Sequence, residues 1–320
     1  MLSPTASLAF RFLCSVGELT SHNDHECPMR IVATILMSAV IGAIVGCASN
    51  TKEDDMQKVT SKDGTAIAFK KSGNGPVVIL ICGALASHKD HGKLAELLSD
   101  HFTVFSYDRR GRGGSEDTKP YAVAREIDDI EALIDHAGGS AFLYGISSGA
   151  CLALEAAATL GDKVTKLAIY EAPYDEGVGE KERWKAYADT LQEYVASSRN
   201  GDAVEYHLKF VGIPDVALVA LKASPQWAEM KSLAHTLLYD VAIVGDDRSV
   251  PAGRIGKIKV PILVMDGEKS LEKMPFMRTS AEKIGSAIPQ SKRRTVEGQD
   301  HQVDEKVMAP ILTDFFSGGR

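Results

Sequence analysis

The sequence is poor in cysteine, in aromatic side chains and in positive charge. Of its 320 residues, 5 are Cys and 7% are aromatic, and 36 Lys and Arg stand against 43 Asp and Glu, a formal net charge of −7. So little cysteine excludes a disulfide-dense scaffold. The mildly acidic balance argues against nucleic acid as a main partner, because phosphate binding requires a basic face. The 44% of apolar residues is typical of a globular chain with a sizeable core.

The first fifty residues contain an apolar run that is short for a membrane-spanning helix. Residues 31–46 carry no charge and follow Arg30, whereas a spanning helix needs roughly 20 apolar residues. A basic start, an apolar core and an exit of small residues are typical of a signal peptide, here at 29–46. The exit ends at Cys47 and resembles the lipobox of bacterial lipoproteins, in which the Cys is acylated and becomes the first mature residue.

This resemblance implies a bacterial envelope protein held at the membrane by a lipid on Cys47, with residues 47–57 as a tether. The alternatives are an uncleaved membrane anchor, or a cytoplasmic protein if the segment is not a signal. Residues 1–28 do not fit a signal peptide, because signal peptides begin close to their apolar run. The simplest hypothesis is that Met29 is the true start.

From residue 58 onward, segments typical of strands alternate with segments typical of helices. The wholly apolar, β-branched run at 77–81 predicts a strand buried on both faces. Strands separated by helices of this length predict an α/β fold, with a mostly parallel sheet covered by helices on both faces. Further strands are predicted at 102–107, 141–144, 166–170, 261–265 and 292–296, and helices at 122–136, 148–160, 272–288 and 303–316.

The alternation stops between residues 173 and 256. Trp184, Tyr187 and Leu191 follow one another at helical spacing, and a second amphipathic stretch begins at Trp227. We interpret 173–256 as a helical cap inserted into a core of 58–172 and 257–320. Aromatic stripes usually serve packing, so we expect most of these rings to bury the cap against the core rather than to line a pocket.

Residues 144–150 contain the motif G-x-S-x-G between a predicted strand and a predicted helix. In that context the motif predicts a sharp turn that holds a nucleophilic serine, Ser147, outward. Gly145 and Gly149 leave room for the crowded backbone. The turn also directs the backbone N–H of Ser148, at the start of the helix, toward a developing oxyanion.

With this motif in place, the chain resembles the α/β-hydrolase superfamily over roughly residues 58–316. Residues 107–115, Tyr-Asp-Arg-Arg-Gly-Arg-Gly-Gly-Ser, are similar to the D-x-R-G-x-G-x-S loop after that family's fourth strand. The resemblance implies an eight-stranded sheet. It makes the Ala84 N–H the second oxyanion donor, with Cys82 where the family usually has His. It also makes His301 the base, since His301 lies between the last predicted strand and the last predicted helix.

The carboxylate that would orient His301 has two candidates. The family usually places an Asp a few residues after its seventh strand, but there this sequence has Ser270, with Asp266 at the strand end. Glu171 closes the sixth predicted strand, where haloalkane dehalogenases and some relatives carry their acid. A carboxylate there can still reach the far nitrogen of the His. We predict Glu171 as the acid and keep Asp266 as the second candidate.

The sequence therefore predicts a serine hydrolase that cleaves a carboxylic ester of a small or medium-sized substrate through an acyl-enzyme. Nothing in it points to a metal or cofactor, so we expect neither. A lactonase, a cofactor-free haloperoxidase-like enzyme and a non-catalytic binding protein of the same fold stay open. A serine at the nucleophile position argues against dehalogenation. The oligomeric state is not indicated.

Overall fold

A computed structural model describes residues 56–318 of the chain. The predicted leader, the predicted signal peptide and Cys47 all lie outside these described residues, so the lipid anchor stays a prediction. Within residues 56–318, no helix is both long enough and apolar enough to cross a membrane.

Eight strands form one sheet in the order β1-β2-β4-β3-β5-β6-β7-β8. β1 pairs antiparallel with β2, β2 pairs antiparallel with β4, and the other pairings are parallel. The predicted α/β fold with a mostly parallel sheet is thus confirmed. The strands are β1 (Gln57–Thr60), β2 (Ala66–Ser72), β3 (Val77–Ile81), β4 (Thr103–Tyr107), β5 (Ala141–Ile146), β6 (Val164–Tyr170), β7 (Ile262–Gly267) and β8 (Lys292–Val296).

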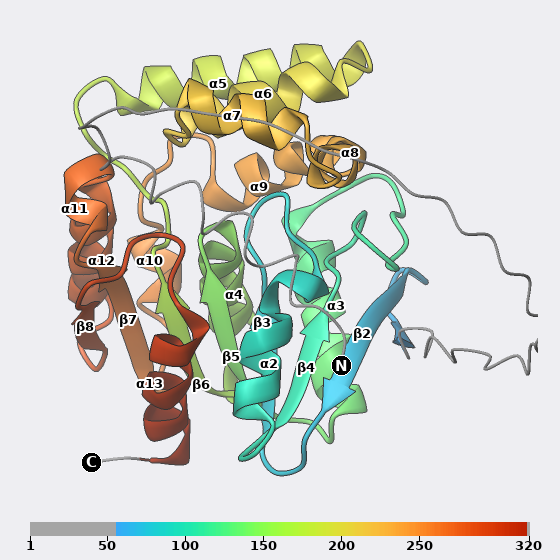
Figure 1. The fold of residues 1–320 in the computed structure, drawn as a ribbon. Helices are drawn as coiled ribbons and strands as arrows, with labels where there is room; N and C mark the ends of the chain where they lie inside the picture. The colour runs from blue at the N-terminus through green and yellow to red at the C-terminus, as the bar shows by residue number, and fades with distance from the viewer. Residues whose placement is uncertain (1–55, 319–320) are drawn as a thin grey trace, which may run out of the picture. The chain divides into compact units, whose positions relative to one another are not determined.

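Helices cover both faces of the sheet, as predicted (Figure 1). On one face, α2 (Gly92–Leu98) packs against α13 (Glu305–Ser317) over a buried apolar cluster that includes Leu98, Val104 and Leu312. On the other face, α3 (Val123–His136) packs against α4 (Ser148–Leu160). β3, β4 and β7 are buried almost along their whole length, because both faces of the sheet are covered.

The segment between β6 and β7 is helical, and we call residues 173–256 the cap. Figure 1 shows its helices α5 to α9 beyond the carboxyl ends of the parallel strands. The cap helices are α5 (Glu180–Ala196), α6 (Asn200–Phe210), α7 (Asp215–Lys222), α8 (Gln226–Ser232), α9 (Leu237–Val244) and α10 (Ala252–Ile255).

The helix predicted at 272–288 is divided in two. α11 (Ser270–Lys273) ends before Pro275, and α12 (Phe276–Ala287) begins after it. Proline lacks an N–H and disfavours the helical conformation of the residue before it, and Met274 is accordingly non-helical at φ −136° and ψ 61°. The last helix begins at Glu305 rather than at 303, because the side chain of Asp304 caps it by accepting from the Lys306 N–H.

His91 is buried as a neutral ring before α2, and this predicts acid sensitivity of the fold. It is 8% exposed and lies against Tyr144, and burial lowers its pKa to about 4. Between about pH 6.5 and pH 4, the histidine of the unfolded chain, with a pKa of about 6.5, binds a proton, whereas His91 of the folded chain stays neutral. The free energy of unfolding is therefore unaffected by His91 above about pH 6.5, and it falls by roughly 3 kcal/mol as the pH falls toward 4.

We therefore expect His91→Phe, which keeps a ring beside Tyr144, to lose less stability than the wild type on acidification. Urea unfolding at about pH 7 and about pH 4.5 measures the two losses in free energy. Equal losses in the two proteins would contradict a neutral, buried His91.

Candidate functional site

Ser147 occupies a strained turn between β5 and α4. Its backbone has φ 58° and ψ −131°, a conformation that costs a non-glycine residue about 1–3 kcal/mol. Its N–H donates to the carbonyl of Tyr170 at 3.0 Å, which ties the turn to the end of β6. A Cβ on Gly145 would lie 2.4 Å from the carbonyl oxygen of Gly149, so a glycine is sterically required at position 145. The turn thus has the tight geometry that the motif predicts.

The loop after β3 packs directly against this turn. A Cβ on Gly83 would lie 2.9 Å from the Cβ of Ser147, and one on Gly149 would lie 2.4 Å from the carbonyl oxygen of Ile81. Ala84 follows Gly83, and Leu85 has the strained φ of 53°. The two backbone N–H groups predicted as oxyanion donors, on Ala84 and Ser148, therefore belong to two segments that touch through backbone atoms.

His301 and Glu171 are brought together. Nδ1 of His301 lies 2.6 Å from Oε2 of Glu171, and the backbone N–H of Gly267 donates to the other carboxylate oxygen at 2.8 Å. Glu171 is 1% exposed and has φ 50°. A buried carboxylate needs hydrogen-bond partners, and the imidazole and the Gly267 amide each contact one of its two oxygens. The ring of His301 remains partly open, with a 26% exposed side chain.

Strand register explains this juxtaposition. Tyr170 pairs with Ile146 in β5 and with Met265 in β7, so β5 and β6 end at the same level and β7 continues for two residues beyond them. Ser147 follows the first of these ends and Glu171 the second. The loop that carries His301 is fixed from the same end of β6, because the Tyr170 hydroxyl donates to the carbonyl of Asp300 at 2.5 Å.

Asp266, the second candidate for the acid, is buried, but its carboxylate contacts side chains other than that of His301. Its Oδ2 accepts from Nε of Arg278 at 3.1 Å and from the hydroxyl of Thr295 at 3.2 Å, and Arg293 lies 3.7 Å from Oδ1. Among the contacts of residues 56–318, none joins Asp266 to His301. Its carboxylate instead ties β7 to β8 and α12.

Three residues with a strained backbone conformation lie at the candidate site. Leu85, Ser147 and Glu171 are among the five non-glycine residues with positive φ in the described part of the chain. Such strain persists only where the surrounding structure determines it, and it gathers at functional sites. The three positions belong to the loop after β3, the turn between β5 and α4, and the end of β6 beside His301.

A second buried cluster adjoins the site and was missed by the sequence analysis. Asp240, in α9 of the cap, accepts from Nη1 of Arg109 at 2.7 Å, from Nη2 of Arg112 at 3.0 Å and from the hydroxyl of Ser148 at 2.8 Å. Burial alone would raise the pKa of Asp240, but the charges of Arg112 and Arg109 outweigh it and hold that pKa below its usual range. A lone carboxylate within the apolar stretch of α9 is the signal that could have indicated it.

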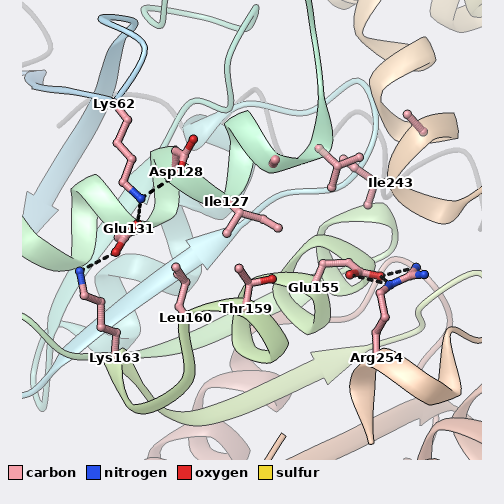
Figure 2. A pocket seen from close by; sticks show the side chains of 13 residues that line it. Lys62, Ile127, Asp128, Glu131, Glu155, Thr159, Leu160, Lys163, Ile243 and Arg254 are labelled. Atoms are coloured by element: carbon pink, nitrogen blue, oxygen red, sulfur yellow. Dashed lines mark hydrogen bonds and ion pairs between the residues drawn. The ribbon is translucent and has the colours of Figure 1, made fainter. Parts of the chain in front are cut away.

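A surface groove of about 590 Å³ between α3, α4 and the cap lies apart from these residues (Figure 2). None of the residues described above as the candidate site lines it. Its charged side chains pair with one another, as Glu155 does with Arg254 at 2.7 Å and Lys163 does with Glu131 at 2.7 Å. We therefore assign no chemistry to this groove.

Neither cysteine of the described chain belongs to a cluster of ligands. Cys82 and Cys151 are buried free thiols, and burial raises the pKa of Cys82 to about 11. Such thiols are poor nucleophiles. Within residues 56–318, no group of three or more His, Cys, Asp or Glu side chains is arranged to hold a metal ion.

Known proteins resemble this chain along most of its described length. Residues 78–306 match a family model described as the alpha/beta hydrolase family. The crystal structure of an alpha/beta hydrolase from Sphaerobacter thermophilus is 44% identical, with a TM-score of 0.71, and the match covers 81% of this chain and 100% of that one.

More distant relatives carry several descriptions. Two of them share the fold at 21% sequence identity. The structure of a bromoperoxidase from Bacillus anthracis has a TM-score of 0.65, and the match covers 82% of this chain and 99% of that one. The structure of an esterase from Exiguobacterium antarcticum has a TM-score of 0.63, and the match covers 82% of this chain and 98% of that one. The probable oxidoreductase EphD of Mycobacterium bovis is 40% identical over 81 residues, which are 24% of this chain and only 14% of that protein.

Proposed function

This chain belongs to the alpha/beta hydrolase family, and we propose that it is a serine hydrolase that cleaves a carboxylic ester through an acyl-enzyme on Ser147. The observation that carries the proposal is the 2.6 Å contact between His301 Nδ1 and Glu171, formed beside a strained serine turn. A nucleophile, a base and a group that orients the base are the three parts that covalent acyl transfer requires.

The contact with Glu171 assigns the tautomer of His301. A carboxylate at 2.6 Å from Nδ1 accepts the ring proton there, which leaves Nε2 as the free base. In the acylation step, Nε2 takes the proton of the Ser147 hydroxyl while Oγ attacks the ester carbonyl carbon. The imidazolium that forms is stabilised by the buried charge of Glu171.

The tetrahedral intermediate places a negative charge on the former carbonyl oxygen. The backbone N–H groups of Ala84 and Ser148 would donate to that oxygen, and a donor of this kind typically contributes about 3–4 kcal/mol. When the intermediate collapses, the bond to the alcohol breaks and His301 returns the proton to the leaving oxygen. The product of this step is the alcohol, with the acyl group bound to Ser147.

Water completes the cycle by the same route. His301 takes a proton from a water molecule, and the water oxygen attacks the acyl carbon. When the second tetrahedral intermediate collapses, the bond from the acyl carbon to Oγ of Ser147 breaks, the acid leaves, and His301 returns the proton to Oγ. Ser147 is half-buried and the cap lies beyond the strand ends above it, which favours a small or medium-sized ester over an extended lipid.

The test uses a fluorophosphonate, which reacts with activated serines, together with a series of 4-nitrophenyl esters of increasing acyl length. We expect the folded protein to take up one label, located on Ser147 by peptide mass spectrometry, and to hydrolyse the shorter esters fastest. Ser147→Ala, which removes only the hydroxyl oxygen, is expected to lose both properties. A folded wild-type protein that neither takes up the label nor turns over any ester would overturn the proposal.

A further inference from the structure

We call residues 82–85, after β3, the oxyanion loop and residues 145–149, around Ser147, the nucleophile turn. Both segments are connected to one carboxylate of the cap, that of Asp240. Asp240 is 6% exposed, and it is the acceptor for two guanidinium groups and for one hydroxyl. α9, which carries it, packs against α4, the helix that begins at Ser148 (Figure 1). Replacing buried ion pairs by apolar side chains often leaves the stability of a protein unchanged, so stability alone does not account for a buried, charged contact at this position.

The first connection runs through Arg112 to the oxyanion loop. Arg112 is held by both carboxylate oxygens of Asp240, each at 3.0 Å from Nη2, and its Nη1 donates to the carbonyl of Gly83. The Gly83 carbonyl and the Ala84 N–H are the two ends of one planar peptide group, and in a trans peptide they point in opposite directions. A donor fixed behind the carbonyl therefore fixes the direction of the Ala84 N–H, and it also polarises that N–H as a donor.

The second connection runs through Ser148 to the nucleophile turn. The Ser148 hydroxyl donates to Oδ1 of Asp240 at 2.8 Å, and the backbone N–H of this same residue is the other oxyanion donor. Arg109 completes the arrangement, because its Nη1 donates to Oδ1 of Asp240 at 2.7 Å and to the carbonyl of Cys82 at 3.3 Å.

The charges of the cluster balance. Arg109 forms a second, two-pronged contact with Glu126, with Nε and Nη2 at 2.8 and 2.9 Å from the carboxylate oxygens. Two guanidinium groups thus face two carboxylates, and all four residues are buried. A balanced and hydrogen-bonded cluster can hold its members in one geometry where a single surface pair could not.

We propose that Asp240 is a positioning residue that aligns both oxyanion donors, the Ala84 N–H through Arg112 and the Ser148 N–H through the Ser148 hydroxyl. This inference rests on the proposed function, since it assigns the cap a part in the chemistry of the same site. The cap would then control the turnover rate and not only the access of substrate. An oxyanion exists only in the transition state and the intermediate, so misaligned donors lower kcat and leave KM nearly unchanged.

The main variant is Asp240→Asn, which keeps the shape of the side chain and removes its charge. We expect kcat for a 4-nitrophenyl ester to fall roughly 10- to 100-fold per fluorophosphonate-titrated site, less than the loss of an entire donor, with KM changed by less than about threefold. Titration counts folded sites, so partial unfolding does not imitate the effect. Ser148→Ala, a milder change that retains the N–H, is expected to lower kcat about fivefold.

The preference for an ester over its thionoester gives a second readout. Sulfur is a longer and weaker hydrogen-bond acceptor than oxygen, so a thionoester gains little from aligned N–H donors. The wild type is expected to prefer the ester strongly. Asp240→Asn is expected to lose most of that preference, and Ser148→Ala a smaller part of it. A residue that only supports the fold would not change this ratio.

The matched control is Glu155→Gln. Glu155 lies in α4, like Ser148, and its ion pair with Arg254 also joins α4 to the cap (Figure 2), but it contacts no oxyanion donor. We expect it to lower the Tm while kcat per titrated site stays within about twofold. Unchanged kcat and unchanged thionoester preference in both Asp240→Asn and Ser148→Ala would overturn the inference. If the wild type itself shows no Ser147-dependent turnover, it is the proposed function that fails.

Discussion

Replacing Glu171 by Gln is expected to lower kcat for ester hydrolysis about 10⁴-fold. The amide of Gln has nearly the volume of the carboxylate, and its oxygen can still accept from the Gly267 N–H, as Oε1 of Glu171 does at 2.8 Å. The amide NH2 group then faces Nδ1 of His301, where a carboxylate now lies at 2.6 Å. A donor at that place makes Nδ1 the acceptor and puts the ring proton on Nε2, so His301 no longer takes the proton of Ser147.

Asp266→Asn is the matched control, since it replaces the second candidate for the acid, which is also buried at this end of the sheet. Asp266 contacts Arg278 and Thr295 and not His301, so we expect kcat within about threefold of the wild type. Its cost appears in stability instead, at about 1–3 kcal/mol, because Arg278 is left without its partner but is partly solvated. Steady-state kinetics and urea unfolding of both variants give the two values. A larger loss of kcat in Asp266→Asn than in Glu171→Gln would transfer the role to Asp266.

The fold could be predicted because its signals are local. The apolar run of β3 and the glycine-flanked serine turn are properties of a few consecutive residues, and these elements form where the pattern places them. Element ends were less predictable where they depend on partners. The predicted strand at 261–265 continues to Gly267, because Asp266 and Gly267 pair with residues of β8. Such pairing depends on the register between two strands, which the sequence of one strand does not determine.

The same difference between local signals and distant partners applies to the residues of the candidate site. Ser147 and His301 follow strands, so their neighbourhood could be inferred from topology. The choice between Glu171 and Asp266 depended on where two side chains point, which is decided by the φ of 50° at Glu171 and by the cations around Asp266. For Asp240 the sequence offers only a carboxylate within an apolar helix and does not indicate its partners. Ser148 and Arg112 are 92 and 128 residues away in the chain and meet Asp240 only when the cap folds over the strand ends.

A glycine of the nucleophile turn is expected to be as sensitive as a residue that performs chemistry. A Cβ on Gly149 would lie 2.4 Å from the carbonyl oxygen of Ile81 and 2.6 Å from that of Cys82, and both of these are backbone atoms of the adjoining β3 segment. Gly149→Ala therefore cannot be accommodated by a side-chain movement, and α4 must shift away from the oxyanion loop. We expect about 3 kcal/mol of lost stability and a fall of at least roughly 100-fold in kcat/KM, since small misplacements of reacting groups are costly.

Gly92→Ala shows what the same substitution does where space and backbone allow it. Gly92 has φ −56° and ψ −43° at the start of α2. Apart from its chain neighbours and the backbone of its own helix, no atom lies within 4 Å of the position that its Cβ would take. Alanine there reduces the freedom of the unfolded chain and is expected to stabilise the protein by about 0.5–1 kcal/mol without changing kcat/KM. Urea unfolding and ester hydrolysis of the two variants side by side measure the contrast. A Gly149→Ala protein as stable and active as Gly92→Ala would mean that the close approach of α4 to β3 does not hold the site together.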